Sequence, residues 1–161
     1  MEVLIDQGAT TDNVSNDALV NGNFEAAGYL LKRGAKPSLA TALCLERWQL
    51  AEELAGAASD EQKQFSLVLA ALNGKAKAVS RVLSYGGVDI NKPSADLYSH
   101  ATPLHHAVSS GSLEAVRALV EAGAKQNIRD SLYNGTPLDW AEYAGKKDIA
   151  AYLAMTAQNL P

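Results

Sequence analysis

Three histidines, His100, His105 and His106, are the side chains of this 161-residue chain best suited to bind a metal ion or to exchange a proton near neutral pH. Metal ligands must converge on one ion, but His105 and His106 are adjacent on a predicted helix and point about 100° apart. The sequence therefore predicts no metal site. His100 lies in a predicted loop, where its imidazole could face solvent, cap the loop or contribute to a pH-sensitive contact.

The single cysteine, Cys44, cannot form an internal disulfide. It lies among Leu39, Leu43 and Leu45 on a predicted helix, which favours a buried, unreactive thiol over a nucleophile. A chain with one such thiol fits a reducing compartment. The first residues, MEVLIDQGA, lack the basic stretch and apolar core of a secretory signal. We therefore expect a cytoplasmic protein.

Motifs for catalysis and for cofactor binding are missing from the sequence. It contains no GxSxG, no HExxH, no phosphate-binding glycine loop and no paired-cysteine zinc spacing. Carboxylates such as Glu52 and Glu53 fit a solvated helix face. We predict that the protein is not an enzyme and uses no cofactor.

The composition excludes further classes of protein. Lys and Arg number 14 and Asp and Glu 18, so the net charge of −4 would repel a phosphate backbone and argues against nucleic acid as a partner. No apolar run approaches the roughly 20 residues needed to cross a bilayer. Apolar residues make up 47% of the chain but aromatic residues only 6%, and no useful stretch alternates with period two, so we expect closely packed helices of Leu, Ala and Val.

A repeated string dominates the second half of the chain. TPLHHA, at 102–107, recurs 34 residues later as TPLDWA, at 136–141, and the following residues keep the same register. Weaker copies precede them. The positions that recur are Gly22, Glu46, Gly74, Gly111 and Gly145 at one place and Leu30, Leu54, Val82, Leu119 and Leu153 at another.

These two strings, together with GSLEAVRALVEAGA at 111–124 and YLLKRGA at 29–35, resemble the ankyrin-repeat family. The resemblance implies units of two antiparallel helices, usually joined by a projecting finger loop. It also implies a non-enzymatic scaffold that binds a protein partner with its fingertips and its concave face. In the family motif the histidine of TPLH, here His105, hydrogen-bonds to neighbouring finger backbone, and Asp139 takes its place in the last unit.

The resemblance predicts an all-α solenoid of about five stacked helix pairs in a single domain, 1–161. The approximate units are 1–9 (partial), 10–35, 36–57, 58–91, 92–126 and 127–161. Successive units are 24, 28, 37 and 34 residues apart along the Leu30 series, against a usual 33. The N-terminal units thus lack room for full fingers, whereas 86–101 forms an enlarged finger and 127–135 a slightly long one.

Helix ends and joints can be predicted residue by residue. Ser59 and Gln62 have capping-box spacing, and Ser112 can cap the helix that follows Gly111, which can adopt a left-handed conformation. Ala107 and Ala141 are small because neighbouring first helices must lie close together. Trp48 and Trp140 are predicted to pack in the core or between units.

Candidate partner-binding residues follow from the family's variable positions on the fingers and at the end of each first helix. Tyrosine there offers a large contact area at low entropic cost, although these rings could instead pack on their own loops. Asp89 and Asp130 are predicted turn formers. The set is Tyr98, Ser99, His100, Ser109, Ser110, Asp130, Leu132, Tyr133, Asn134 and Tyr143.

Two other functions remain open at this stage. Met1–Ala9 resembles the second helix of a unit without its first, so the chain could be a structural segment of a longer array that self-associates through its N-terminal end. Alternatively, a small molecule could bind between the long finger and the helix ends, as in a small-molecule binder or an unrecognised enzyme.

Overall fold

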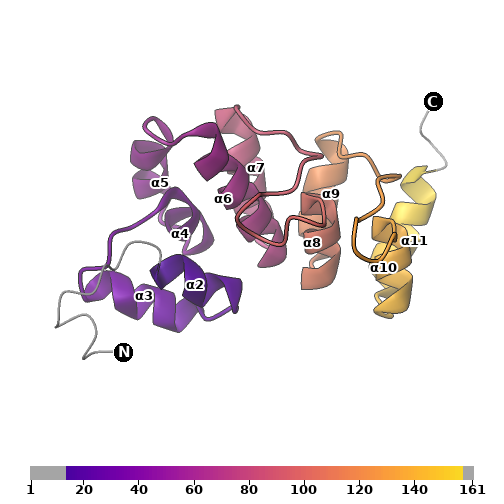
Figure 1. Cartoon of the computed structure of the whole chain (residues 1–161), viewed down its shortest axis with the longest axis horizontal. Coiled ribbons are helices and arrows are strands. Elements are labelled where there is room, and N and C mark those ends of the chain that lie inside the picture. Colours follow the sequence, from indigo (N-terminus) through magenta and orange to yellow (C-terminus); the bar gives the residue numbers. More distant parts are fainter. Residues whose placement is uncertain (1–13, 158–161) are drawn as a thin grey trace.

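The computed structural model describes residues 14–157, and all regular secondary structure in that range is helical (Figure 1). An isolated bridge between Ser94 and Leu97 is its only strand-like pairing. The helices form five antiparallel pairs, which confirms the predicted all-α solenoid. The pairs are α2 (Val14–Val20) with α3 (Phe24–Lys32), α4 (Leu39–Cys44) with α5 (Trp48–Ala55), α6 (Asp60–Leu72) with α7 (Ala76–Tyr85), α8 (Pro103–Ser110) with α9 (Leu113–Glu121), and α10 (Pro137–Tyr143) with α11 (Lys147–Ala157).

The first helices of the pairs stack in order, with α2 on α4, α4 on α6, α6 on α8 and α8 on α10. The main core runs along this stack and is built from Leu, Ala and Val side chains, as predicted, with a buried isoleucine. Ala107 and Ala141 are fully buried within it. Within 14–157, no helix is both long and apolar enough to span a bilayer.

Helix caps follow the sequence closely. The Ser59 N–H donates to Gln62 Oε1 (2.9 Å) and the Gln62 N–H donates to Ser59 Oγ (3.2 Å), which confirms the capping box of α6. The Ser112 hydroxyl accepts from the Ala115 N–H at the start of α9 (3.1 Å). Gly111, with φ +79°, ends α8 in the left-handed region, where glycine carries no Cβ penalty.

Glu46 occupies the recurring glycine position between α4 and α5 and adopts the same left-handed backbone, with φ +57°. For a residue with a Cβ that conformation costs about 1–2 kcal/mol. Its side chain gains only a partly exposed ion pair with Lys75 (3.4 Å), a kind of contact worth about 0–1 kcal/mol.

We expect Glu46→Gly to raise the free energy of unfolding by about 0.5–1 kcal/mol, because the relief of strain exceeds the extra chain entropy of glycine. Urea unfolding monitored by helical circular dichroism measures the change. Glu25→Gly, in the first turn of α3, is the matched control and should lower stability by about 1 kcal/mol. Equal losses in both variants would contradict the strain at Glu46.

Connections between pairs differ as the unit spacing predicts. Residues 33–38 and 56–59 join the first three pairs. The longer connections are the first finger, residues 86–102, between α7 and α8, and the second finger, residues 122–136, between α9 and α10 (Figure 1).

The first finger folds back over α6. Leu97 is 5% exposed and packs in a second apolar cluster that includes Val68 and Leu69 of α6. Gln64, also on α6, accepts from the Asp89 N–H (3.0 Å) and donates to the Asp89 carbonyl (3.0 Å) and to the Lys92 carbonyl. The finger is thereby fixed to the preceding unit, a feature the sequence did not reveal.

Candidate functional site

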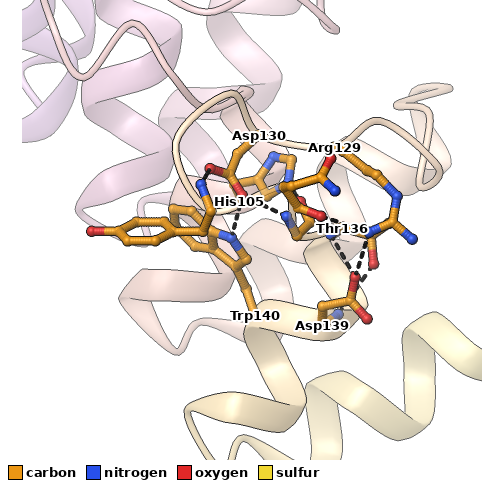
Figure 2. Close-up of polar contacts among 9 residues, drawn as sticks. His105, Arg129, Asp130, Thr136, Asp139 and Trp140 are labelled. Atoms are coloured by element: carbon orange, nitrogen blue, oxygen red, sulfur yellow. Dashed lines mark hydrogen bonds and ion pairs between the residues drawn. The ribbon is translucent and has the colours of Figure 1, made fainter.

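Asp130 is the organising residue of the second finger. Its side chain is 3% exposed, and Oδ1 accepts from the Leu132 N–H (2.9 Å) and the Tyr133 N–H (2.6 Å). The other oxygen, Oδ2, accepts from the Gly135 N–H (2.9 Å) and from Nε1 of Trp140 (3.0 Å), as Figure 2 shows in part. The predicted turn-forming role is confirmed. Its buried carboxylate shapes the loop rather than presenting itself at the surface.

The Asp130 carboxylate stays ionised. Burial raises its pKa, but the hydrogen bonds from Tyr133, Trp140, Gly135 and Leu132 stabilise the charged form and lower the pKa to about 2. A fixed negative charge therefore holds the loop closed at every pH above about 4.

His105 joins α8 to the second finger. It is fully buried, and its Nε2–H donates to the Gly135 carbonyl (3.0 Å), so Nδ1 of the neutral ring accepts from the Thr102 N–H (3.3 Å). The Thr102 hydroxyl lies 2.8 Å from the same nitrogen. Burial lowers the pKa of His105, which favours this neutral form. The brace implied by the family resemblance is confirmed.

Further hydrogen bonds connect the two fingers to each other. The Ser131 N–H in the second finger donates to the His100 carbonyl in the first (2.9 Å), and the Lys125 N–H donates to Asn91 Oδ1 (2.7 Å). Asp139, which replaces the motif histidine, accepts from the Thr136 N–H (2.8 Å) and so caps the start of α10.

Six rings gather where the fingers meet α8 and α10, and we call them the ring cluster: Tyr98, His100, His105, His106, Tyr133 and Trp140. The Trp140 ring centroid lies 5.0 Å from that of His105 and 6.2 Å from those of His100 and Tyr133. The predicted packing of Trp140 between units is confirmed. His100, placed in a loop by the sequence, is half-buried in this cluster.

An open pocket of about 800 Å³ lies beside the ring cluster, between the end of α8 and α10. Two polar groups of its wall are engaged within the protein: Trp140 Nε1 with Asp130, and the Asp139 carboxylate with Thr136 and Arg129 (Figure 2). The remaining wall is mostly apolar. The lining residues are Val108, Ser109, Tyr133, Gly135, Asp139, Trp140, Tyr143, Ala144 and Lys146.

The structure brings some of the predicted site residues together and separates others. Ser109, Tyr133 and Tyr143 line the pocket, and Tyr133 and Tyr143 are 72% and 97% exposed. Leu132 is 61% exposed on the second finger, with Asn134 nearby in the same loop. Tyr98, 50% exposed, and Ser99 lie on the first finger, outside the pocket lining.

Two residues serve local structure. The Ser110 hydroxyl donates to the Ala107 carbonyl (2.7 Å) and accepts from the Ser112 N–H (3.1 Å), so it helps to close the end of α8. Asn134 has φ +56° and its carbonyl accepts from Arg129 (2.6 Å).

The single cysteine is buried. Cys44 is 1% exposed, and burial raises the pKa of its thiol to about 12, which confirms the predicted unreactive cysteine. Among the described residues, no three His, Cys, Asp or Glu side chains lie close enough to hold a metal ion. Met1–Ala9, proposed for self-association, lies outside the described residues.

A family model for ankyrin repeats in three copies matches residues 39–130 and 67–160, most of the chain. The chain belongs to the ankyrin-repeat family. The matched residues include the helix pairs from α4 to α11 and both long fingers.

Curated ankyrin-repeat relatives share part of the sequence. Cyclin-dependent kinase 4 inhibitor B of Bos taurus is 37% identical over 79 residues, covering 49% of this chain and 58% of that protein. The Rattus norvegicus inhibitor B is 30% identical over 129 residues, covering 77% of this chain and 95% of its own length. Potassium channel AKT1 of Arabidopsis thaliana is 37% identical over 82 residues, 51% of this chain but 9% of the channel.

Proposed function

We propose that this ankyrin-repeat protein is a non-enzymatic interaction module that binds a protein partner through its two fingers and the concave face of α8 and α10. The observation that carries the proposal is an exposed aromatic and apolar surface on a hydrogen-bonded support. Tyr98, Leu132, Tyr133 and Tyr143 are 50–97% exposed, while Asp130 and His105 hold the loops beneath them in place.

The chemistry of this surface favours a protein partner. Tyrosine and tryptophan are enriched at the centres of protein interfaces, where a few such anchors provide most of the binding energy. Because most of the pocket wall is apolar and Trp140 Nε1 and the Asp139 carboxylate already bond within the protein, the wall offers carbon surface to an apolar side chain of the partner. Two of the relatives are, by name, inhibitors of a kinase, which supports protein as the class of partner.

The test is Tyr98→Ala combined with Tyr133→Ala. We expect the double variant to lose partner capture by at least about 30-fold, since hot-spot aromatic residues contribute roughly 2 kcal/mol or more each. Helicity should stay unchanged because both tyrosines lie on the fingers, outside the helices, and are 50% and 72% exposed. Affinity capture from a lysate of the native organism, with quantification of each retained protein, measures the effect.

Tyr29→Ala is the matched control, because Tyr29 is a 43% exposed tyrosine on α3, away from both fingers. It should retain the captured partner. If the well-folded double variant captures the same partner as the parent chain, the finger surface is not the binding site.

A small-molecule binder is the second candidate, because a pocket of about 800 Å³ falls within the size range of ligand sites. Thermal melts against a fragment collection test it. We rank it below protein binding because the pocket is open and its Trp140 and Asp139 polar groups already bond within the protein, so they are not free to orient a small ligand.

A further inference from the structure

His106 is a titratable residue in a core position of α8. Its side chain is 3% exposed, and its Nε2 has no hydrogen-bond partner among the described residues. In the repeat register, the equivalent residues of the neighbouring units are Leu69 and Trp140. An imidazole thus stands where the adjacent units place a large apolar side chain, and one of its nitrogens faces neither water nor an acceptor.

The first finger covers this imidazole. The centroid of the His106 ring lies 5.9 Å from the Tyr98 ring and 6.4 Å from the His100 ring. The backbone of Tyr98 and Ala101, in the same segment, is close enough to the ring that hydrogen bonding to it raises the pKa of His106. The finger therefore has to move if His106 is to reach water.

No neighbouring charge favours protonation of His106. The titratable groups that influence the pKa of His106 are the imidazoles of His100, on the first finger, and His105, on α8. No charged side chain of α6 contributes. The Asp130 carboxylate acts on His105 instead, and Asp139 pairs with Arg129 (3.4 Å). Burial, followed by His100, lowers the pKa of His106 to about 4, despite the backbone hydrogen bonds.

We propose that His106 is a pH-dependent switch, which we call the latch. Protonation of its imidazole displaces the first finger from α8 and disrupts the partner-binding surface. The proton binds Nε2, which has no hydrogen-bond partner in the closed site, so its new N–H is left unsatisfied there. Water reaches the imidazolium only when Tyr98–Ala101 moves away. The effect on partner binding rests on the proposed function, whereas the movement of the finger does not.

The second finger follows the first. The Ser131 N–H donates to the His100 carbonyl, so displacement of His100 breaks the contact that joins the two loops. When the first finger moves away from His106, the Ser131 N–H should therefore become accessible to water as well.

The direction of the pH effect follows from the pKa of His106, which is lower in the closed protein than the ordinary 6.5. The closed state is fully favoured above pH 6.5 and loses stability as the pH falls from 6.5 toward 4. Because one proton is taken up on opening, the opening constant rises about 30-fold between pH 7.5 and pH 5.

Amide hydrogen exchange of the native chain, followed by NMR and corrected for intrinsic rates, tests the latch. We expect the opening constant at Ser131 to rise about 30-fold between pH 7.5 and pH 5. The amide of Val79, bonded to the Lys75 carbonyl in α7, is the reference and should change far less. A constant Ser131 value, or an equal rise at Val79, would overturn a local latch.

His106→Leu should remove the pH dependence at Ser131, and an undiminished rise in this variant would overturn the proposal. His106→Met provides the same test should the leucine variant fold poorly. In the parent chain, NMR titration of the His106 imidazole should show protonation below the ordinary range. Titration at the ordinary value with Ser131 still protected would also overturn it.

Partner capture at pH 7.5 and pH 5.5 connects the latch to the proposed function. We expect the parent chain to lose its partner at the lower pH and His106→Leu to retain it. If Ser131 opens with acid while capture persists in both chains, the latch remains, and the proposed binding surface is wrong.

Discussion

Asp130→Ala is expected to lower the free energy of unfolding by about 3 kcal/mol, because it removes a buried carboxylate that accepts four hydrogen bonds. A hydrogen bond to a charged group contributes about 1.5–3 kcal/mol. The total stays below the sum of four because water can reach the amides of the exposed Leu132 and Tyr133 once the loop opens. Urea unfolding measures the loss, and the NMR signal of Trp140 Nε1–H should shift.

Asp96→Ala is the matched control for Asp130. Asp96 is exposed on the first finger and its carboxylate makes no hydrogen bond within 14–157, so its loss should cost under about 0.5 kcal/mol. A cost for Asp130→Ala as small as this control would show that the second finger does not depend on the carboxylate.

Ala107→Leu is expected to lower the free energy of unfolding by about 2–3 kcal/mol, because added methylene groups overpack a closed core. Ala107 is fully buried on α8, whose neighbours α6 and α10 pack against it on either side. The larger side chain must push at least one of these first helices away. Thermal and urea unfolding measure the loss of stability.

Ala122→Leu is the control for Ala107→Leu, because it adds the same atoms at an exposed position after α9. Its stability should change by under about 0.5 kcal/mol. If the two variants were equally stable, the packing between α8 and its neighbours would have space for the larger side chain.

Acid titration separates the contributions of Asp130 and His106. The folded-state pKa of Asp130 lies below its ordinary value, so its contribution is present above about pH 4 and disappears as the pH falls through about 2. The contribution of neutral His106 is lost between pH 6.5 and about 4. Of these two groups, only His106 therefore loses its contribution to stability above pH 4.5.

Local rules predicted most of the fold. The TPLHHA and TPLDWA register, glycines at helix ends and the Ser59–Gln62 capping box depend on residues close in sequence, so each could be inferred from residue type and spacing. The anchoring of the first finger by Gln64 could not. Gln64 and Asp89 are 25 residues apart, and nothing in either residue type specifies the other as its partner.

The candidate site was predictable only in parts. Asp130 is a common turn-forming residue and was predicted as one, but its bond to Trp140 depends on how the second finger meets α10. The ring cluster likewise draws residues from both fingers and from two helices. The burial of His106 had a readable signal, since the repeat register aligns it with Leu69 and Trp140.

The folded-back first finger affects how unfolding spreads along the molecule. In a solenoid each unit is coupled mainly to its neighbours, so disorder can advance from an end one unit at a time. Leu97 and Gln64 fix the connecting finger to the third helix pair, in addition to the stacking of α6 on α8, whereas the earlier pairs stack on one another with only short loops between them. Separating the third and fourth pairs therefore breaks the contacts of the finger as well as the stack of α6 on α8, so we expect α6 and α8 to unfold together.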